Sequence, residues 1–151
     1  YFGKGIDMVV EAAKMFPAFS FSILGVRDEL NHLQLPENVK IIHPQPHDKI
    51  AEFFSMHEFY MQLSIAEGFP NAVCESMLCG CIPIGSDVFG IPDIIGDTGF
   101  ILKKKDLTLL KKLVETAVAS DKAMLLKKAR QRIIDNFPAE KRERELLKVI
   151  S

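Results

Sequence analysis

The apolar residues of this chain recur with two spacings, one typical of helices and one typical of strands. Spacings of three and four residues, as in the run from Ile6 to Phe16 that ends at Pro17, predict amphipathic helices. Helices are expected at residues 6–16, 48–54, 70–79 and 91–95, at two places after Asp106, and at 139–150. Short alternating or continuous apolar runs predict strands at residues 19–25, 38–43, 59–63, 81–85 and 99–102.

The order of these elements predicts the fold class. Strands alternate with helices, which is the pattern of βαβ units. We therefore expect an α/β fold, a doubly wound parallel sheet with helices on both faces. The chain shows no internal repeat, low-complexity tract or linker, and its 151 residues suit one domain. Residues 1–151 are thus predicted to form a single domain.

Composition narrows the classes of partner. The chain is 48% hydrophobic and carries 19 basic and 20 acidic side chains, as ordinary soluble proteins do. The formal net charge of −1 gives no electrostatic reason to expect a nucleic-acid partner. No apolar run reaches the roughly 20 residues of a membrane-spanning helix, and the first residues lack the layout of a signal peptide. We expect a cytoplasmic location.

Three cysteines, Cys74, Cys79 and Cys81, lie close together in an apolar segment. Their odd number and crowding indicate reduced thiols rather than a disulfide framework. Their spacing matches no zinc-binding pattern, and no histidine lies near them in sequence, so no metal site is expected.

The segment SIAEGFPNAVCE, residues 64–75, concentrates the candidate chemistry. It follows a predicted strand and leads into a helix that Pro70 opens. In an open parallel sheet, ligands bind beyond the carboxyl ends of the strands, where helix N-termini offer unpaired N–H groups and the positive end of a dipole. An anionic ligand suits this place.

The two acids of this segment, Glu67 and Glu75, need a separate account because a phosphate alone has no use for carboxylates. Ionised carboxylates only accept hydrogen bonds, so their partners are hydroxyls or cations. A nucleotide sugar, which carries both phosphates and hydroxyls, would satisfy every group here. Spacing alone equally allows Glu67 to be a solvated loop residue and Glu75 a first-turn glutamate favoured by the helix dipole. Both interpretations remain open on spacing.

Several short motifs along the chain together resemble one enzyme family. They are Glu67-GFPNAVC-Glu75 after Ser64, Lys4-Gly5-Ile6-Asp7 with Glu11-Ala12-Ala13, Leu24-Gly25, Asn38-Val39, Leu78 to Ser86, and Gly96 to Phe100. Their order and spacing are similar to those of the carboxy-terminal, donor-binding domain of retaining GT-B glycosyltransferases (glycosyltransferase family 4, group 1 type). The resemblance covers nearly the whole chain and implies the Rossmann-like half of a GT-B fold.

The resemblance also implies roles for individual residues. Lys4 matches the lysine that binds the donor diphosphate, Glu67 the glutamate near the transferred sugar, and Glu75 the glutamate that holds the ribose hydroxyls. Lys4 and Glu67 are therefore the predicted catalytic residues. The predicted donor-binding residues are Glu75, Gly68, Phe69, Pro70, Asn71, Ala72 and His47, with the base near the last of these. The resemblance implies no cofactor and no metal.

The sequence departs from the family pattern at three places. The arginine that assists the lysine lies, in the family, on a strand that would precede Tyr1. The usual Gly-Gly pair is Phe89-Gly90 here, and the acid that follows is the shorter Asp93. The amino-terminal acceptor domain is not in this sequence. We therefore expect half an enzyme, inactive alone, that binds the sugar donor.

The partners implied are a nucleoside diphosphate sugar, the protein's own amino-terminal domain and a glycan or lipid-linked acceptor. The resemblance places the reaction in bacterial surface polysaccharide synthesis, with peripheral association at the inner face of the membrane through the missing domain. Two alternatives stay open. One is a stand-alone nucleotide-binding module, or a separate subunit, without catalysis of its own, and the other is a nucleotide-sugar epimerase-like domain.

Overall fold

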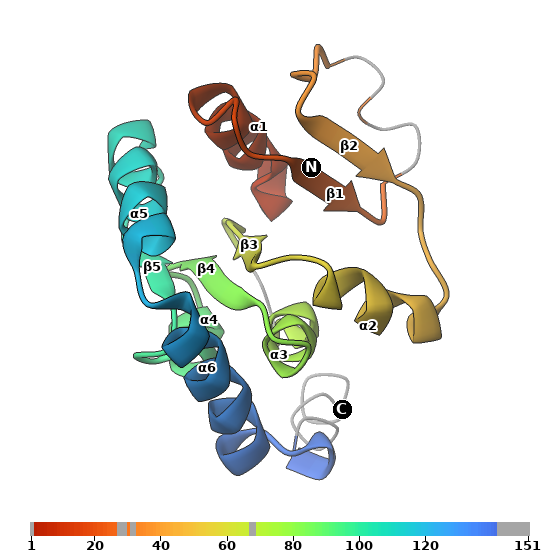
Figure 1. Cartoon of the computed structure of the whole chain (residues 1–151), viewed down its shortest axis with the longest axis vertical. Helices are drawn as coiled ribbons and strands as arrows, with labels where there is room; N and C mark the ends of the chain where they lie inside the picture. Colours follow the sequence, from red (N-terminus) through yellow and green to blue (C-terminus); the bar gives the residue numbers. More distant parts are fainter. Residues whose placement is uncertain (1, 27–29, 31–32, 67–68, 142–151) are drawn as a thin grey trace.

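The computed structural model describes residues 2–26, 30, 33–66 and 69–141 (Figure 1). The helices are η1, a 3-10 turn (Phe2–Lys4), α1 (Ile6–Met15), α2 (His47–Ser55), α3 (Asn71–Leu78), α4 (Ile91–Ile95), α5 (Leu107–Ala119) and α6 (Lys122–Asn136). The strands are β1 (Phe21–Leu24), β2 (Val39–Ile42), β3 (Phe59–Gln62), β4 (Ile82–Ser86) and β5 (Phe100–Leu102).

These bounds confirm the sequence-based elements. Each predicted helix or strand with stated bounds up to residue 102 is present, with ends within two residues of those expected. The turn η1 was not predicted. The charged helix expected at residues 139–150 falls mostly outside the described residues.

Local sequence explains where several helices begin and end. The side chain of Asp106 accepts a hydrogen bond from the N–H of Leu109 over 2.8 Å, and Asp121 caps α6 in the same way through Met124 over 3.1 Å. Gly80 follows α3 with a φ of 90°, which is the left-handed conformation that commonly ends a helix.

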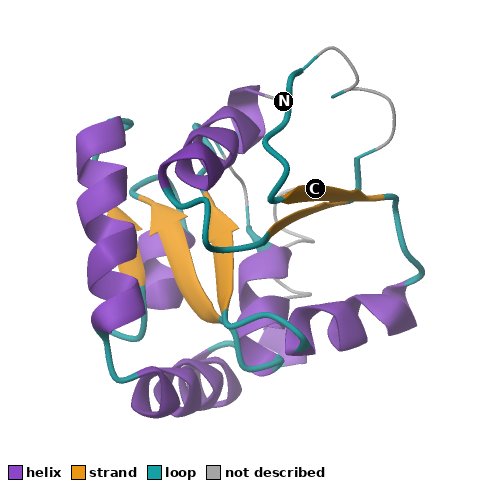
Figure 2. Ribbon diagram, turned by 45° about the horizontal axis from the view of Figure 1, so that its top comes forward, coloured by secondary structure: helices purple, strands orange, loops and turns teal. Residues whose placement is uncertain are grey.

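All the described strands are parallel, and helices cover both faces of the larger sheet, so the predicted fold class is confirmed (Figure 2). The strands do not form one continuous sheet, however. β1 pairs with β2, while β3, β4 and β5 form a separate sheet in that order. The edges of β1 and β3 face each other across a cavity of about 820 Å³, which we call the slot.

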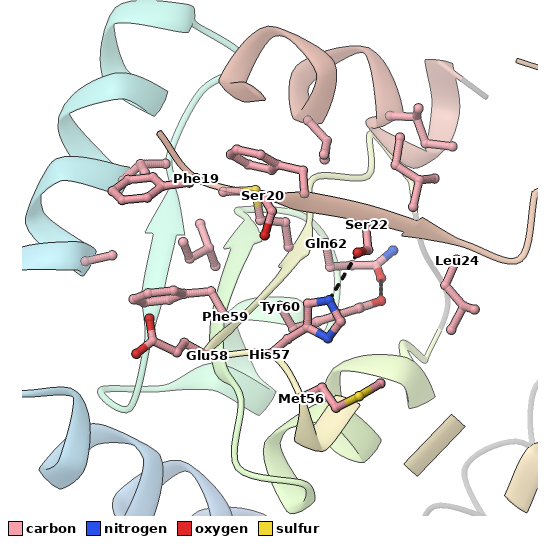
Figure 3. Close-up of a pocket in the computed structure, with 18 of the residues that line it drawn as sticks. Phe19, Ser20, Ser22, Leu24, Met56, His57, Glu58, Phe59, Tyr60 and Gln62 are labelled. Carbon is pink, nitrogen blue, oxygen red and sulfur yellow. Dashed lines mark hydrogen bonds between the residues drawn. The ribbon is translucent and has the colours of Figure 1, made fainter. Parts of the chain in front are cut away.

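The two sheets run in the same direction. α1 starts against the end of β3, where a Cβ on Gly5 would overlap the carbonyl oxygen of Leu63, and it leads to the start of β1. At the other end, Nε2 of His57, just before β3, lies 3.2 Å from Oγ of Ser22 in β1 (Figure 3). The beginnings of β1 and β3 are therefore neighbours, and their carboxyl ends lie on the side where α1 begins.

Apolar packing holds the helices onto the sheets in three clusters. On one face of the larger sheet, Met8 and Ala12 of α1 pack with Leu110 and Val114 of α5. On the other face, α3, α4 and α6 contribute a second cluster whose fully buried members include Val73, Met77, Ile94 and Ile133. A third cluster joins α1 to β1 through Val10 and Ile23.

The amide of Asn38 ties the end of α1 to the start of β2. Its Nδ2 donates to the carbonyl oxygens of Ala13, Phe16 and Phe19 over 3.0, 3.2 and 2.9 Å. These carbonyls belong to the last turn of α1 and to the segment after it, where the regular hydrogen bonds of the helix end. The Asn38 side chain therefore fixes the connection between the end of α1 and the start of β1.

Candidate functional site

The predicted site lies at the carboxyl ends of the strands, where three helices begin. Lys4 belongs to η1, directly before α1, and is exposed. His47 is the first residue of α2 and is also exposed. Asn71 is the first residue of α3, which follows β3. The helix therefore starts one residue later than expected, and Pro70 is its N-cap.

The segment that carries Lys4 is fixed to the exit of β3. The N–H of Ile65 donates to the carbonyl oxygen of Gly3 over 2.9 Å. Gly5 has a φ of 75° and lies directly against the carbonyl of Leu63. Only glycine fits this conformation and this close approach. These contacts place Lys4 beside the start of the loop that continues to Glu67.

Glu67 and Gly68 themselves lie outside the described residues. Their predicted contacts with the transferred sugar and the phosphates therefore remain predictions. The loop is described again from Phe69, which is half-buried and packs against the cluster around α3, and Pro70 is buried.

The amino end of α3 is closed by main-chain hydrogen bonds. The N–H of Asn71 donates to the carbonyl oxygen of Phe69, and the N–H of Val73 donates to that of Pro70, both over 3.0 Å. The amide of Asn71 is thus already engaged within the loop. Ala72, the last predicted amide donor of this segment, lies in the first turn of α3.

Glu75 is half-buried on α3, one turn before Cys79. Burial raises the pKa of the Cys79 thiol, the negative charge of Glu75 raises it further, and the positive charge of Arg130 opposes them. The carboxylate, the thiol and the guanidinium therefore interact where α3 packs against α6. Glu75 lies on the helix that the sequence spacing indicated.

The three cysteines are free thiols, as predicted. Cys81 is fully buried, and its Sγ donates to the carbonyl oxygen of Phe54 over 3.2 Å. Burial, and to a smaller degree the nearby Cys79, raises the pKa of Cys81 to about 12. The Cys81 thiol is therefore protonated at neutral pH.

The slot is separate from most of the predicted site. Its walls are the edges of β1 and β3, including Ser22, Leu24, Phe59 and Gln62 (Figure 3). Of the predicted site residues that the structure describes, Lys4 alone lines it. β1 and β3 line the slot with the edges that pair with no other described strand.

A partly buried polar network near the site was not predicted from the sequence. Tyr60 donates to Oε1 of Gln62 over 2.5 Å, and Nε2 of Gln62 donates to Oγ of Ser64 over 2.7 Å. Ser86 of β4 donates to the carbonyl oxygen of Ser64 over 2.6 Å. The signal that could have revealed it is Gln62, an amide inside an otherwise apolar strand.

The described residues also bear on metals and membranes. No group of three or more His, Cys, Asp or Glu side chains in this part of the chain could hold a metal ion. Among the same residues, no helix combines the length and the apolar character needed to cross a bilayer.

Comparison with known proteins defines the class. The family model for Glycosyl transferases group 1 matches residues 2–139, and the chain belongs to this family. It is 30% identical over 158 residues to the N-acetyl-alpha-D-glucosaminyl L-malate synthase of Bacillus anthracis, covering 91% of this chain and 39% of that protein. It is 23% identical over 129 residues to a phosphatidylinositol N-acetylglucosaminyltransferase subunit of Arabidopsis thaliana, covering 77% and 28%.

Solved structures give the same fold. The sucrose-phosphate synthase of Thermosynechococcus elongatus superposes with a TM-score of 0.84 at 22% identity, over 99% of this chain and 42% of that one. Anabaena Alr3699/HepE, solved in complex with UDP-glucose, gives 0.80 at 17% identity, over 99% and 46%. The fold is thus the Rossmann-like part of a GT-B glycosyltransferase. The chain spans less than half the length of each of these four proteins.

Proposed function

We propose that residues 1–151 are the donor-binding half of a retaining glycosyltransferase of the family 4 type, which moves a sugar from a nucleoside diphosphate sugar to an acceptor. The observation that carries this proposal is the match to the Glycosyl transferases group 1 family across residues 2–139. The geometry supports it, because Lys4 is fixed beside the loop that leads from β3 to the amino end of α3.

In this proposal, Lys4 and the amino end of α3 stabilise the negative charge that develops on the departing diphosphate. Glu67 contacts the hydroxyls of the transferred sugar, and Glu75 holds the ribose hydroxyls. Backbone groups of residues 68–72 approach the sugar and phosphates, and His47 lies near the base. The protein supplies position and charge, with neither metal nor cofactor.

The donor proposed is UDP-N-acetylglucosamine. The two relatives named above carry an N-acetylglucosaminyl group in their names, and the Anabaena structure holds UDP-glucose. The acceptor is a glycan or lipid-linked hydroxyl compound in surface polysaccharide synthesis. A cytoplasmic location, with peripheral association at the inner membrane face through another domain, belongs to the same proposal.

A panel of nucleotide sugars, tested on the full-length protein by thermal unfolding, checks the donor. A ligand present at about 100 times its dissociation constant adds about 2.7 kcal/mol to the free energy of unfolding. UDP-N-acetylglucosamine and UDP are expected to raise the melting temperature, whereas GDP and ADP sugars are not. A shift in melting temperature with GDP-mannose alone would identify GDP-mannose as the donor in place of UDP-N-acetylglucosamine. Unchanged melting temperatures across the panel would contradict a donor-binding role.

We also assign the slot to a strand from the polypeptide before Tyr1, in the segment that would connect to an amino-terminal acceptor domain. A strand that runs parallel to β1 and β3 must end at their carboxyl ends. Gly3 is hydrogen-bonded at that position, just after β3, so a short connection reaches η1. Such a strand would pair with both edges and join the two sheets into one.

Amide exchange tests the strand directly. Phe21 and Gly25 direct their N–H groups to β2, so Ser22 and Leu24 direct theirs into the slot. Exchange at Ser22 and Leu24 should be slow in the full-length protein and fast in residues 1–151 alone. The N–H of Phe21 is the internal control, because β2 bonds it in both proteins. Fast exchange at Ser22 and Leu24 in the full-length protein would overturn the assignment.

A further inference from the structure

We infer that Tyr60, Gln62, Ser64 and Ser86 form a positioning network that fixes the Ser64–Ile65 peptide, where the chain leaves β3, relative to Lys4. The inference rests on the proposed function and adds positioning residues to it. None of the four belongs to the predicted donor-binding set, and each is argued to act through the loop rather than by touching the donor.

The first part of the network runs along β3. Side chains two residues apart in a strand lie on one face, so Tyr60, Gln62 and Ser64 are neighbours there. Tyr60 is itself oriented by an edge-on contact with the ring of Phe54, with ring centroids 5.4 Å apart. Its hydroxyl donates to Gln62, whose amide donates to Ser64. The Gln62 side chain is therefore held at both of its amide atoms, by Tyr60 and by Ser64.

The second part joins β3 to β4 beyond their last paired residues. The strand ladder ends at Gln62 opposite Gly85. Beyond it, Oγ of Ser86, the residue after Gly85, donates over 2.6 Å to the carbonyl oxygen of Ser64, two residues after Gln62. Ser64 is 1% exposed and Ser86 is 9% exposed, so water competes little for this bond. The exit of β3 is thus held in place after the ladder itself has ended.

The third part is a single peptide group, the one between Ser64 and Ile65. Its carbonyl accepts from Ser86, and its N–H donates to the carbonyl oxygen of Gly3 over 2.9 Å. A trans peptide is planar, so its C=O and N–H point in opposite directions and turn together. Ser86 on one side therefore sets the direction of the bond to Gly3 on the other, next to Lys4.

This arrangement links the two halves of the proposed site. Lys4 follows Gly3 by one residue, and Glu67 follows Ile65 by two. A rotation of the Ser64–Ile65 peptide would move the diphosphate-binding lysine relative to the sugar-binding loop. Misplacement of a reacting group by about 1 Å can cost about a hundredfold in rate. Loss of the network is therefore expected to lower kcat more than it raises KM for the donor.

The test uses Ser86→Ala in the full-length protein, with Ser120→Ala as its control. The hydroxyl of Ser120 also donates to a main-chain carbonyl over 2.6 Å, that of Ala117, but at the far end of α5. Ser86→Ala should speed amide exchange at Ile65 by about tenfold, the factor expected for one lost hydrogen bond. It should also lower kcat with UDP-N-acetylglucosamine while changing KM little. Ser120→Ala should change neither.

Gln62→Met gives a second, independent variant, because methionine keeps the length of the side chain and removes its amide. Gln62→Met should increase the amide exchange rate of Ile65, as Ser86→Ala does. The double variant should increase this rate by less than the product of the two single fold-changes. Unchanged exchange at Ile65 in both single variants would overturn the network. If the wild type turned over no nucleotide sugar while Ile65 responded as expected, the proposed function would fail and the positioning network would stand.

Discussion

Gly5 and Leu63 lie in direct backbone contact, with no room for a side chain between the start of α1 and the exit of β3. Replacing Gly5 with alanine adds a Cβ that overlaps the Leu63 carbonyl and forces a left-handed φ on a residue that disfavours it. We expect Gly5→Ala to lower the free energy of unfolding by about 2–5 kcal/mol, measured by urea unfolding.

Gly80→Ala is the matched control for this substitution. Gly80 has a φ of 90°, yet nothing lies within 4 Å of the position of its Cβ. Its substitution should cost only the conformational part, about 1–2 kcal/mol. Equal losses for the two variants would show that the contact between Gly5 and Leu63 is not close in solution.

Asn38 offers a test of the connection between α1 and β2. Asn38→Ala removes the donor to three carbonyls and should cost about 1–3 kcal/mol. Asn38→Asp has the same shape but points a carboxylate at those carbonyls, so it should cost more at neutral pH. Protonation of that carboxyl restores a donor, so the excess loss should shrink as the pH falls. A pH-independent difference between the two variants would contradict this geometry.

The raised pKa of Cys81 predicts that the folded protein loses stability at alkaline pH. That pKa is raised from the usual 9.0 to about 12 by burial. Between these values the unfolded chain has released the proton and the folded chain has kept it, so the free energy of unfolding falls as the pH rises. Unfolding measured between pH 9 and pH 12 should show a steeper fall for the wild type than for Cys81→Ala. Parallel profiles would mean that the thiol ionises normally in the folded protein.

Phe89 is the one non-glycine residue of the described chain with a positive φ, 44°, and it is 73% exposed. Phe89→Gly should therefore raise the free energy of unfolding, by up to about 1 kcal/mol, because strain is relieved at little cost in packing. Phe89→Ala keeps the strain and should change stability little. Thermal unfolding of both variants distinguishes relief of strain from loss of the ring.

The positions of helices and strands could be predicted from the sequence because each depends on local spacing. Ile6 to Phe16 show a helical face, and the helix ends before Pro17. The gap between β1 and β3 could not be predicted in this way. Strand order in a sheet depends on contacts between distant segments, and no local pattern records that β3 pairs with β4 while β1 pairs with β2.

The site was predicted in part, through the resemblance of short motifs to the family. The resemblance assigned Lys4, His47 and Glu75 to the site, and the structure describes Lys4 directly before α1, His47 as the first residue of α2 and Glu75 within α3. The peptide between Ser64 and Ile65, which joins β4 to η1, depends on contacts with Ser86 and with Gly3, both distant from it in sequence. Such contacts leave no periodic signal.

We propose that this chain binds a nucleoside diphosphate sugar through Glu75 and the loop before α3. Calorimetric titration of the full-length protein with UDP tests it most directly. Glu75→Ala should weaken binding by about 1.5–3 kcal/mol, roughly ten- to a hundredfold, because it removes a charged hydrogen-bond acceptor for the ribose. Glu115→Ala, on the exposed face of α5, should leave the affinity unchanged. An equal UDP affinity for Glu75→Ala and the wild type would contradict the claim.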